Sequence, residues 1–357
     1  MAKPRIIAIV NQKGGVRWST ARGFLRPAMK RGNLRVLTHA HTDGLILDGK
    51  RVTGVRFTHK GRAMRAEAGG EVLLSAGAIN SPKILELSGI GRPDLLSGMG
   101  ITPLHELSGV GENLQDHLQA RPVFKTDLST INIEVSNFFK QGMIALEYAL
   151  KRSGPMAMAA SLGTGFLKTE PHMDVPDIQF HIQPFSATHP ADGPHKFSAF
   201  TASVLQLRPE STGHLALKSA NWWDHPAIHP NYLATQTDQR TIVRGIQVAR
   251  RIAEFSPLKE HILEEFAPGR DVAYDDYDGT LEWARNTAVT IYHPTGTCKM
   301  GQDDMSVVDA RLRVRGITGL RVADCSIMPT IVSGNTNAPA IMIGEKVSDM
   351  MLEDAIA

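Results

Sequence analysis

The stretch from Val72 to Gly91 constrains the fold more than any other part of the chain. An apolar run, Val72–Leu74, leads into the tight turn SAGAINSP, and a helix is predicted from about Ser81-Pro82, where proline is tolerated in the first turn. The Gly and Ser residues suit a sharp change from strand to helix that leaves the helix N-terminus open to an anion. This strand–turn–helix is one half of a nucleotide-fold crossover and predicts an α/β part.

The middle of the chain has a different pattern. Ile178, Phe180 and Ile182 alternate with polar residues, which predicts a half-buried antiparallel strand, and the runs 198–207 and 214–218 are expected to continue its sheet. A hairpin turn is expected at Asp48-Gly49. Helices are predicted at 138–152, around 238–255 and 278–288, and from about Pro339 to Leu352. The fold class is therefore mixed α/β, an α/β part interrupted by a long antiparallel insertion.

Composition excludes several classes of protein. The 357 residues are 42% hydrophobic and 21% charged with a formal net charge of +3, which excludes a disordered polyelectrolyte and a disulfide-stapled mini-protein. No Lys/Arg run is long enough to predict nucleic-acid binding, and no apolar stretch approaches the roughly 20 residues of a membrane-spanning helix. Cys298 and Cys325 lack CxxC spacing and a neighbouring cluster of histidines, so we expect a reduced, cytoplasmic protein without a metal site.

Two glycine-containing loops suggest nucleotide binding at first sight. Asn11–Thr20, NQKGGVRWST, resembles the phosphate loop of chromosome-partitioning ATPases, but Arg17 and Trp18 stand where Gly and the phosphate-binding Lys belong. Nucleotide hydrolysis is therefore not expected. Gly109–Leu114, GVGENL, lacks the third Gly of a dinucleotide fingerprint, so an ordinary turn is predicted there.

Three separated segments resemble one family, the flavin-dependent glucose–methanol–choline (GMC) oxidoreductases. They are Gly77–Gly91, Tyr292–Gly301 (YHPTGTCKMG), and Leu320–Pro329 followed by Ser333–Pro339. Supporting matches, in family order, are RWSTARGFLRPA, VGENLQDH, LRPESTGHLAL and PNYLATQTDQ, so the resemblance runs from about Arg17 to the C-terminus. It implies FAD-dependent oxidation of a small-molecule alcohol, with electrons passed on to an acceptor that the sequence does not identify. The sequence is most similar to the choline and alcohol dehydrogenase branch, because Asn335 stands where some relatives carry a second His.

The resemblance also implies roles for individual residues. His293 would be the base or the imidazole that stabilises the alkoxide, and Asn335 would hydrogen-bond the same oxygen. Asn335 also suits a cap or turn before the last helix, and the two roles are compatible. The residues implied to contact FAD are Ser75, Ala76 and Gly77 near its ADP part, and Asp324 and Asn337 near its ribityl and ring region. Structural roles are expected for His117, His181 and the two cysteines.

The resemblance also sets the expected domain organisation. The family's strand–GxGxxG–helix unit does not appear in the sequence, which implies a truncated chain with weakened flavin affinity, or a non-catalytic remnant or interaction module. The expected parts are a foreign strand and loop at 1–16, a partial FAD-binding domain at 17–120, a substrate-binding domain at 121–290, and a return to the FAD-binding domain at 291–357. Trp222 and Trp223 are taken as adjacent strand residues on opposite faces, so no aromatic cage for a cation is expected from them.

Overall fold

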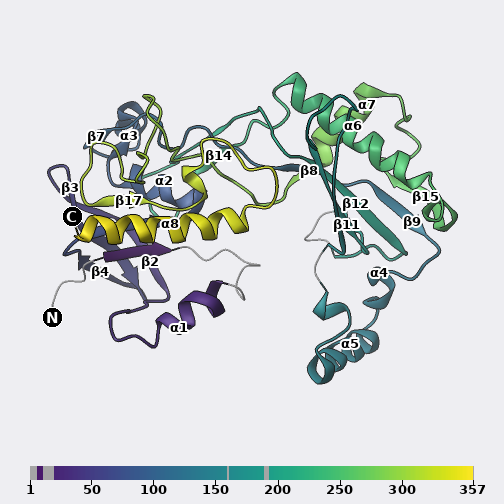
Figure 1. Ribbon diagram of the computed structural model, residues 1–357, viewed down its shortest axis with the longest axis horizontal. Helices are drawn as coiled ribbons and strands as arrows, with labels where there is room; N and C mark the ends of the chain where they lie inside the picture. The colour runs from purple at the N-terminus through teal and green to yellow at the C-terminus, as the bar shows by residue number, and fades with distance from the viewer. Residues whose placement is uncertain (1–5, 11–19, 159–160, 189–192, 357) are drawn as a thin grey trace. The chain divides into compact units, whose positions relative to one another are not determined.

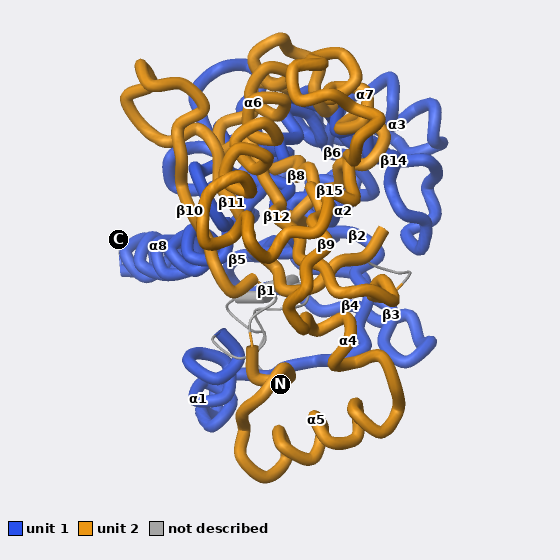
Figure 2. Tube along the Cα trace, turned by 90° about the vertical axis from the view of Figure 1, so that its right-hand side faces the viewer, with its two compact units in different colours: residues 1–116, 212–231, 293–357 blue, residues 117–211, 232–292 orange. Residues whose placement is uncertain are grey.

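The computed structural model describes residues 6–10, 20–158, 161–188 and 193–356, with the backbone alone for 6–10. The chain forms two compact units (Figures 1 and 2). Unit 1 comprises residues 1–116, 212–231 and 293–357, and unit 2 comprises residues 117–211 and 232–292. Most of the loop that resembles the partitioning ATPases, residues 11–19, lies outside the described residues.

The centre of unit 1 is a parallel sheet in the order β1-β5-β17. Ile6 of β1 pairs with Glu71 of β5, and Leu320 of β17 pairs with Val72, so β5 is hydrogen-bonded on both edges. The strands are β1 (Ile6–Val10), β5 (Glu71–Ser75) and β17 (Leu320–Val322). Helix α2 (Gly77–Leu87) follows β5 directly, which confirms the predicted strand–turn–helix, but the helix begins before Ser81 and Pro82 lies inside it rather than in its first turn.

The remaining elements of unit 1 surround this sheet. The predicted hairpin at Asp48-Gly49 is present, with Gly49 at φ +56° between β2 and β3. The other strands are β2 (Ala40–Asp48), β3 (Arg51–His59), β4 (Arg62–Glu67), β6 (Ile90–Gly91), β7 (His105–Glu106), β13 (His214–Ala216) and β14 (Ala227–His229). The helices are η1 (Ala21–Leu25), α1 (Arg26–Ala28), α3 (Pro93–Gly98), η4 (Cys325–Ile327) and α8 (Asn337–Ile356).

The core of unit 1 lies between the parallel sheet and α8. Val72 and Leu74 of β5 are fully buried and belong to one cluster with Ile343, Val347 and Met351 of α8. The helix runs alongside β17 (Figure 1). This packing fixes the C-terminal segment, and with it the residues just before α8, against the strand that precedes α2.

Unit 2 is built on a largely antiparallel sheet of seven strands. Its main order is β10-β11-β12-β8-β16, and β9 pairs with both β12 and β15. The strands are β8 (Leu118–Ala120), β9 (Val123–Thr126), β10 (Gly163–Leu167), β11 (Ile178–Gln183), β12 (Ala199–Gln206), β15 (Ile262–Ala267) and β16 (Val289–Thr290). The helices are α4 (Ile131–Glu134), α5 (Phe138–Lys151), η2 (Pro155–Ala157), α6 (Gln236–Ala253), η3 (Leu258–His261) and α7 (Tyr277–Thr287).

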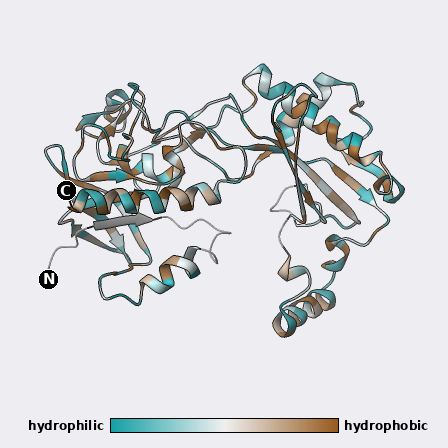
Figure 3. Cartoon of the chain, in the orientation of Figure 1, coloured by the Kyte–Doolittle hydropathy of each residue, from teal (hydrophilic) through white to brown (hydrophobic). Residues whose placement is uncertain are grey.

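One face of this sheet packs against α6 and α7. Phe180 of β11 and Val204 of β12 are buried in one cluster with Ile242 and Ile246 of α6 and Leu281 of α7. The other residues of α6 are largely hydrophilic, so that both kinds alternate along the helix (Figure 3). The helices cover the face predicted from the alternating residues at 178–182, and the opposite face carries the polar members of the same strands.

The structure confirms the mixed α/β fold with a partial Rossmann-like unit and an antiparallel-sheet unit, and changes two details. The run 214–218 does not continue the unit 2 sheet, because β13 pairs with β14 in a separate two-stranded sheet of unit 1. The sequence-based division also placed residues 212–231 in the 121–290 domain, whereas they pack in unit 1.

Trp222 and Trp223 lie in a turn, so the expectation of opposite strand faces is wrong. Their rings stack on each other, with centroids 4.1 Å apart, and His41 lies 4.6 Å from the Trp223 ring. The turn is held by Asp224, which accepts hydrogen bonds from Ser219 and Asn221, and period-two alternation does not apply to such a turn.

Candidate active site

The structure brings His293 and Asn335 together, 42 residues apart in the sequence. Nδ2 of Asn335 lies 3.4 Å from Nε2 of His293. An amide nitrogen can only donate, so this contact uses Nε2 of the imidazole as the acceptor. His293 is half-buried and Asn335 is exposed. A nitrogen that can accept a proton and a neutral hydrogen-bond donor therefore lie in contact with each other, and their roles in catalysis stay a prediction.

Asp116 and Gln115 hold this pair in place. The backbone N–H of His293 donates to Oδ1 of Asp116 at 2.9 Å. Gln115 pairs through its backbone with Thr295, while its side-chain oxygen accepts the N–H of Ile331 at 3.0 Å. One buried glutamine thus connects the His293 segment to the segment that leads to Asn335.

Sequence reasoning missed the roles of Gln115 and Asp116. Both are buried, although glutamine and aspartate are usually exposed in proteins. The signal available was the run of three polar residues in NLQDH, between Leu114 and Leu118, in a segment expected to pack.

Asp324 organises the turn between β5 and α2. Its Oδ2 accepts the N–H of Gly77 at 2.9 Å and the hydroxyl of Ser81 at 2.5 Å, and its Oδ1 accepts the N–H of Ser326 at 2.8 Å. The hydroxyl oxygen of Ser81 in turn accepts the N–H of Ala76. Gly77 has a φ of +83°, which explains the glycine at this position. The carboxylate therefore joins the start of α2 to the end of β17.

The seven residues predicted for catalysis and FAD binding all lie in unit 1. Ser75 ends β5, Ala76 and Gly77 begin α2, and Asn337 is the first residue of α8, where its side chain is exposed. Asp324 is spent on the protein itself, so its direct contact with a flavin stays a prediction, as do the roles of the other six residues.

Burial suppresses the reactivity of both thiols. Cys298 is fully buried, and burial raises the pKa of its thiol well above the usual value, with the nearby Asp324 charge acting in the same direction. Burial likewise raises the pKa of Cys325 to about 12. Both are free thiols that stay protonated at neutral pH, which excludes a thiolate nucleophile.

Glu86 is a buried acid on the helix that carries the turn. It is 1% exposed, its Oε2 accepts the N–H of Leu217 at 3.1 Å, and its Oε1 has no partner among the described residues. Burial raises the pKa of Glu86 to about 8, against the smaller opposing effects of the Leu217 hydrogen bond and Arg92. The carboxyl group is therefore largely protonated at neutral pH.

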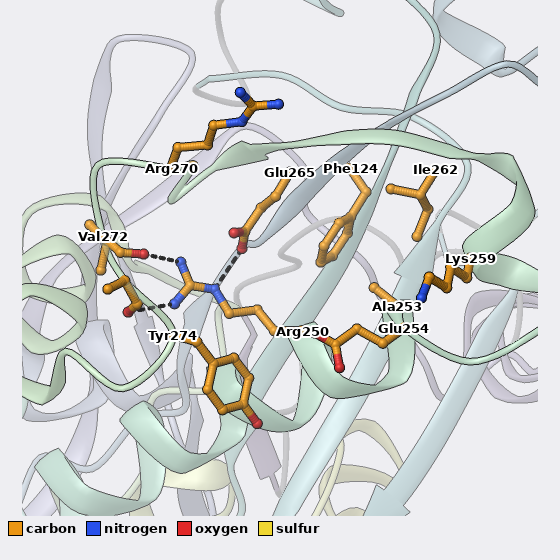
Figure 4. A pocket seen from close by; sticks show the side chains of 12 residues that line it. Phe124, Arg250, Ala253, Glu254, Lys259, Ile262, Glu265, Arg270, Val272 and Tyr274 are labelled. Atoms are coloured by element: carbon orange, nitrogen blue, oxygen red, sulfur yellow. Dashed lines mark hydrogen bonds and ion pairs between the residues drawn. The ribbon is translucent and has the colours of Figure 1, made fainter.

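Unit 2 has a cavity of about 520 Å³ between α6, β15 and the loop 269–274 (Figure 4). Its most buried cation, Arg250, donates to Glu265 at 2.8 Å and to the carbonyls of Val272 and Ala273. The guanidinium is thus fully occupied by the protein and stabilises the loop. We assign no ligand to this cavity.

Two further features bear on the class of protein. Within the described ranges, no group of three or more His, Cys, Asp or Glu side chains is arranged to hold a metal ion. No described helix combines the length and the apolar character that a bilayer crossing requires.

Comparison with known proteins identifies the class. Two family models, both described as GMC oxidoreductase, match residues 4–119 and 209–344, together more than half of the chain. An alcohol dehydrogenase [acceptor] of Pseudomonas putida is 39% identical over 349 residues, covering 96% of this chain and 62% of the relative. An oxygen-dependent choline dehydrogenase of Escherichia coli O139:H28 is 41% identical over 339 residues, covering 94% and 61%.

Two solved structures of oxidases have a similar fold. Pyridoxine 4-oxidase from Mesorbium loti superposes with a TM-score of 0.80 at 26% identity, covering 92% of this chain and 60% of that one. A formate oxidase gives a TM-score of 0.84 at 25% identity, covering 90% and 61%. The chain belongs to the GMC oxidoreductase family. It spans about three fifths of the length of the relatives that it matches, and the match of the first family model begins at residue 4, inside the segment expected to be foreign.

Proposed function

We propose that this chain acts as an FAD-dependent oxidoreductase that oxidises the CH–OH group of a small alcohol, like the alcohol and choline dehydrogenases among its relatives. The observation that carries the proposal is the approach of His293 Nε2 and Asn335 Nδ2 to 3.4 Å. The names of the relatives support an alcohol as the substrate class; one name leaves the electron acceptor open and the other specifies oxygen, so the proposal names no acceptor. The two free thiols support a cytoplasmic location.

The turn at the start of α2 fits a flavin nucleotide. Among the described residues, apart from its chain neighbours and its own helix backbone, no atom lies within 4 Å of the position a Cβ would take on Gly77, while Asp324 and Ser81 hold the backbone of the turn. A helix N-terminus also favours the negative charge of a nucleotide. Ser75, Ala76, Gly77 and Asn337 would hold FAD, and Asp324 would fix the turn that contacts it. When bound, FAD supplies the hydride acceptor.

His293 and Asn335 would have different roles in the reaction. Nε2 of His293 accepts the proton of the substrate hydroxyl, and the Asn335 amide donates a hydrogen bond to the oxygen on which negative charge develops. The hydrogen bond from the His293 N–H to Asp116 keeps the imidazole segment in place while the proton moves. An amide carries no charge at any pH, so Asn335 orients the oxygen without competing for the proton.

The test combines flavin binding with a half-reaction. We expect the purified chain incubated with FAD to retain flavin absorbance after gel filtration. The visible absorbance of the oxidised flavin should then bleach when alcohol is added under anaerobic conditions. His293→Gln should slow this bleaching by about 10²- to 10⁴-fold, the range for a general base. His172→Gln, at an exposed position, is the matched control. A chain that retains no flavin, or a His293→Gln variant that bleaches at the original rate, contradicts the proposal.

A further inference from the structure

A row of polar side chains crosses the sheet of unit 2 on the face opposite α6 and α7. Ser203 of β12 pairs with His181 of β11, and His181 pairs with Thr164 of β10. On the other side of β12, Val204 pairs with Ala120, and the N–H of Ala202 donates to the carbonyl of Pro122. Arg121 lies in the two-residue link between β8 and β9, and continuing the register of these two strands across the link places it opposite Ser203.

The register also determines which face the row occupies. Ala120, Phe180, Ala202 and Val204 neighbour the row residues along their strands and are buried in the cluster under α6 and α7. Because successive residues of a strand point to opposite faces, Arg121, Ser203, His181 and Thr164 share the other face. Directly opposed residues have Cβ atoms about 5 Å apart, so neighbouring members can bind one small group together. We call Arg121, Ser203 and His181 the polar row.

The polar row lacks the partners that buried polar groups normally have. Ser203 is 0% exposed, and its hydroxyl has no hydrogen-bond partner among the described residues. Arg121 and His181 are half-buried. Burial lowers the pKa of the Arg121 guanidinium, and no carboxylate of the described residues acts against this effect. Burial also lowers the pKa of His181, so its neutral imidazole offers one N–H.

The charged groups found near Arg121 do not neutralise it. Lys125 forms an ion pair with Glu264 at 2.5 Å, so that carboxylate is occupied. His195 lies within the field of both Arg121 and Lys125, which lowers the pKa of its imidazole in addition to the larger effect of burial. The polar row therefore combines an uncompensated cation with an unpaired buried hydroxyl, and a half-buried cation without a counter-charge is costly unless an anion binds it.

We propose that the polar row is a binding site for the anionic group of a small organic ligand. A guanidinium, a hydroxyl and an imidazole N–H are all donors to a carboxylate or phosphate oxygen, and a planar guanidinium matches either group with two parallel hydrogen bonds. The ligand class is therefore a small organic anion that carries a carboxylate or phosphate group. The same site disfavours a quaternary ammonium alcohol, because Arg121 would repel it.

Calorimetric binding to the full chain tests this without requiring turnover. The probes are glycolate, ethylene glycol as its uncharged match in size, and choline. We expect glycolate to bind about tenfold or more tightly than either of the others, the scale of one charge-assisted hydrogen bond. Arg121→Gln should abolish that preference and Arg121→Lys should retain part of it. Arg240→Gln, which changes an exposed arginine of α6, should leave the preference unchanged.

The outcomes separate this inference from the proposed function. Displacement of glycolate by inorganic phosphate assigns the site to phosphate-bearing ligands, and its absence assigns the site to carboxylates; both results support an anion site. Glycolate binding supports the site whether or not glycolate bleaches the flavin, so the outcome for this inference does not depend on the outcome for the proposed reaction. Equal binding of glycolate and ethylene glycol, tighter binding of choline, or an Arg121→Gln variant that keeps the preference overturns the inference, even if uncharged alcohols bleach the flavin.

Discussion

The β5–α2 turn of unit 1 and the polar row of unit 2 both contain a fully buried serine, but treat it in opposite ways. Ser81 donates to Asp324 and accepts from Ala76, so its hydroxyl is satisfied. Ser203 is equally buried, and its hydroxyl has no partner among the described residues. Unpaired buried polar groups are rare and costly, so their location carries information. The contrast indicates that the turn is a finished frame, whereas the polar row is completed by a ligand.

The largest expected effect is the loss of stability when the hydrogen bonds of the β5–α2 turn are removed. Asp324→Ala removes the acceptor for Gly77, Ser81 and Ser326 at once, leaving buried donors unsatisfied, and should lower the free energy of unfolding by about 3 to 5 kcal/mol. Urea denaturation followed by circular dichroism measures this. Asp304→Ala, at an exposed aspartate, is the control and should change little. Equal stability of the two variants would show that the Asp324 contacts are not a frame.

The second prediction concerns Glu86 on α2, whose Oε1 has no partner among the described residues and whose carboxyl group is buried in its protonated form. Its folded-state pKa of about 8 lies above the ordinary value of 4.5, so the unfolded chain releases this proton at lower pH than the folded chain. Stability from this group is therefore complete below about pH 4.5 and is lost as pH rises toward 8. Glu86→Gln removes the ionisation and should stabilise the protein by on the order of 3 kcal/mol at pH 7, with little effect near pH 4.5.

Thermal unfolding of wild type and Glu86→Gln across this pH range provides the measurement. Glu345→Gln, at an exposed glutamate of α8, is the control and should not change the pH dependence. A stability difference between wild type and Glu86→Gln that stays constant with pH would mean that Glu86 does not change its ionisation on unfolding.

The smallest effect, and the most direct comparison of the two regions, comes from the two serines. Ser81→Ala should cost about 1 to 3 kcal/mol, because it removes both of its hydrogen bonds from a buried site. Ser203→Ala should fall within about 0.5 kcal/mol of wild type or stabilise the protein, since no partner is lost. Chemical denaturation of both variants in the same buffer decides this. A large loss for Ser203→Ala would reveal a partner and remove the basis for the contrast.

Local patterns predicted many of the elements. The helices expected at 138–152, 238–255 and 278–288 are α5, α6 and α7 to within a few residues, and the alternation at 178–182 is β11. Helical and strand periodicities depend on neighbours a few residues apart, so sequence carries them directly. Trp222 and Trp223 were misjudged because the surrounding segment is a turn held by Asp224, and composition alone did not distinguish it from a strand.

In the candidate site, too, the sequence indicated residues within local motifs and missed residues that act through non-local contacts. The motifs around His293 and Asn335 singled out both residues, because residue types at fixed spacing identify a segment even when its partners are unknown. Gln115 and Asp116 went unrecognised, since their work is to connect segments about 180 and 216 residues away. The same holds for Asp324, whose hydrogen bonds to Gly77 and Ser81 join segments far apart in the sequence, while its expected contact with a flavin stays a prediction.

The sequence by itself determined the mixed α/β class, most helix positions, the family resemblance and the two residues most suited to alcohol chemistry. Tertiary structure decided which polar groups are satisfied and which are not. Ser203 and His181 come from two strands and Arg121 from the link between β8 and β9, and they form one row only through strand register, which is set by non-local pairing. Whether a buried hydroxyl has a partner depends on atoms brought from elsewhere in the chain, and no local pattern encodes that.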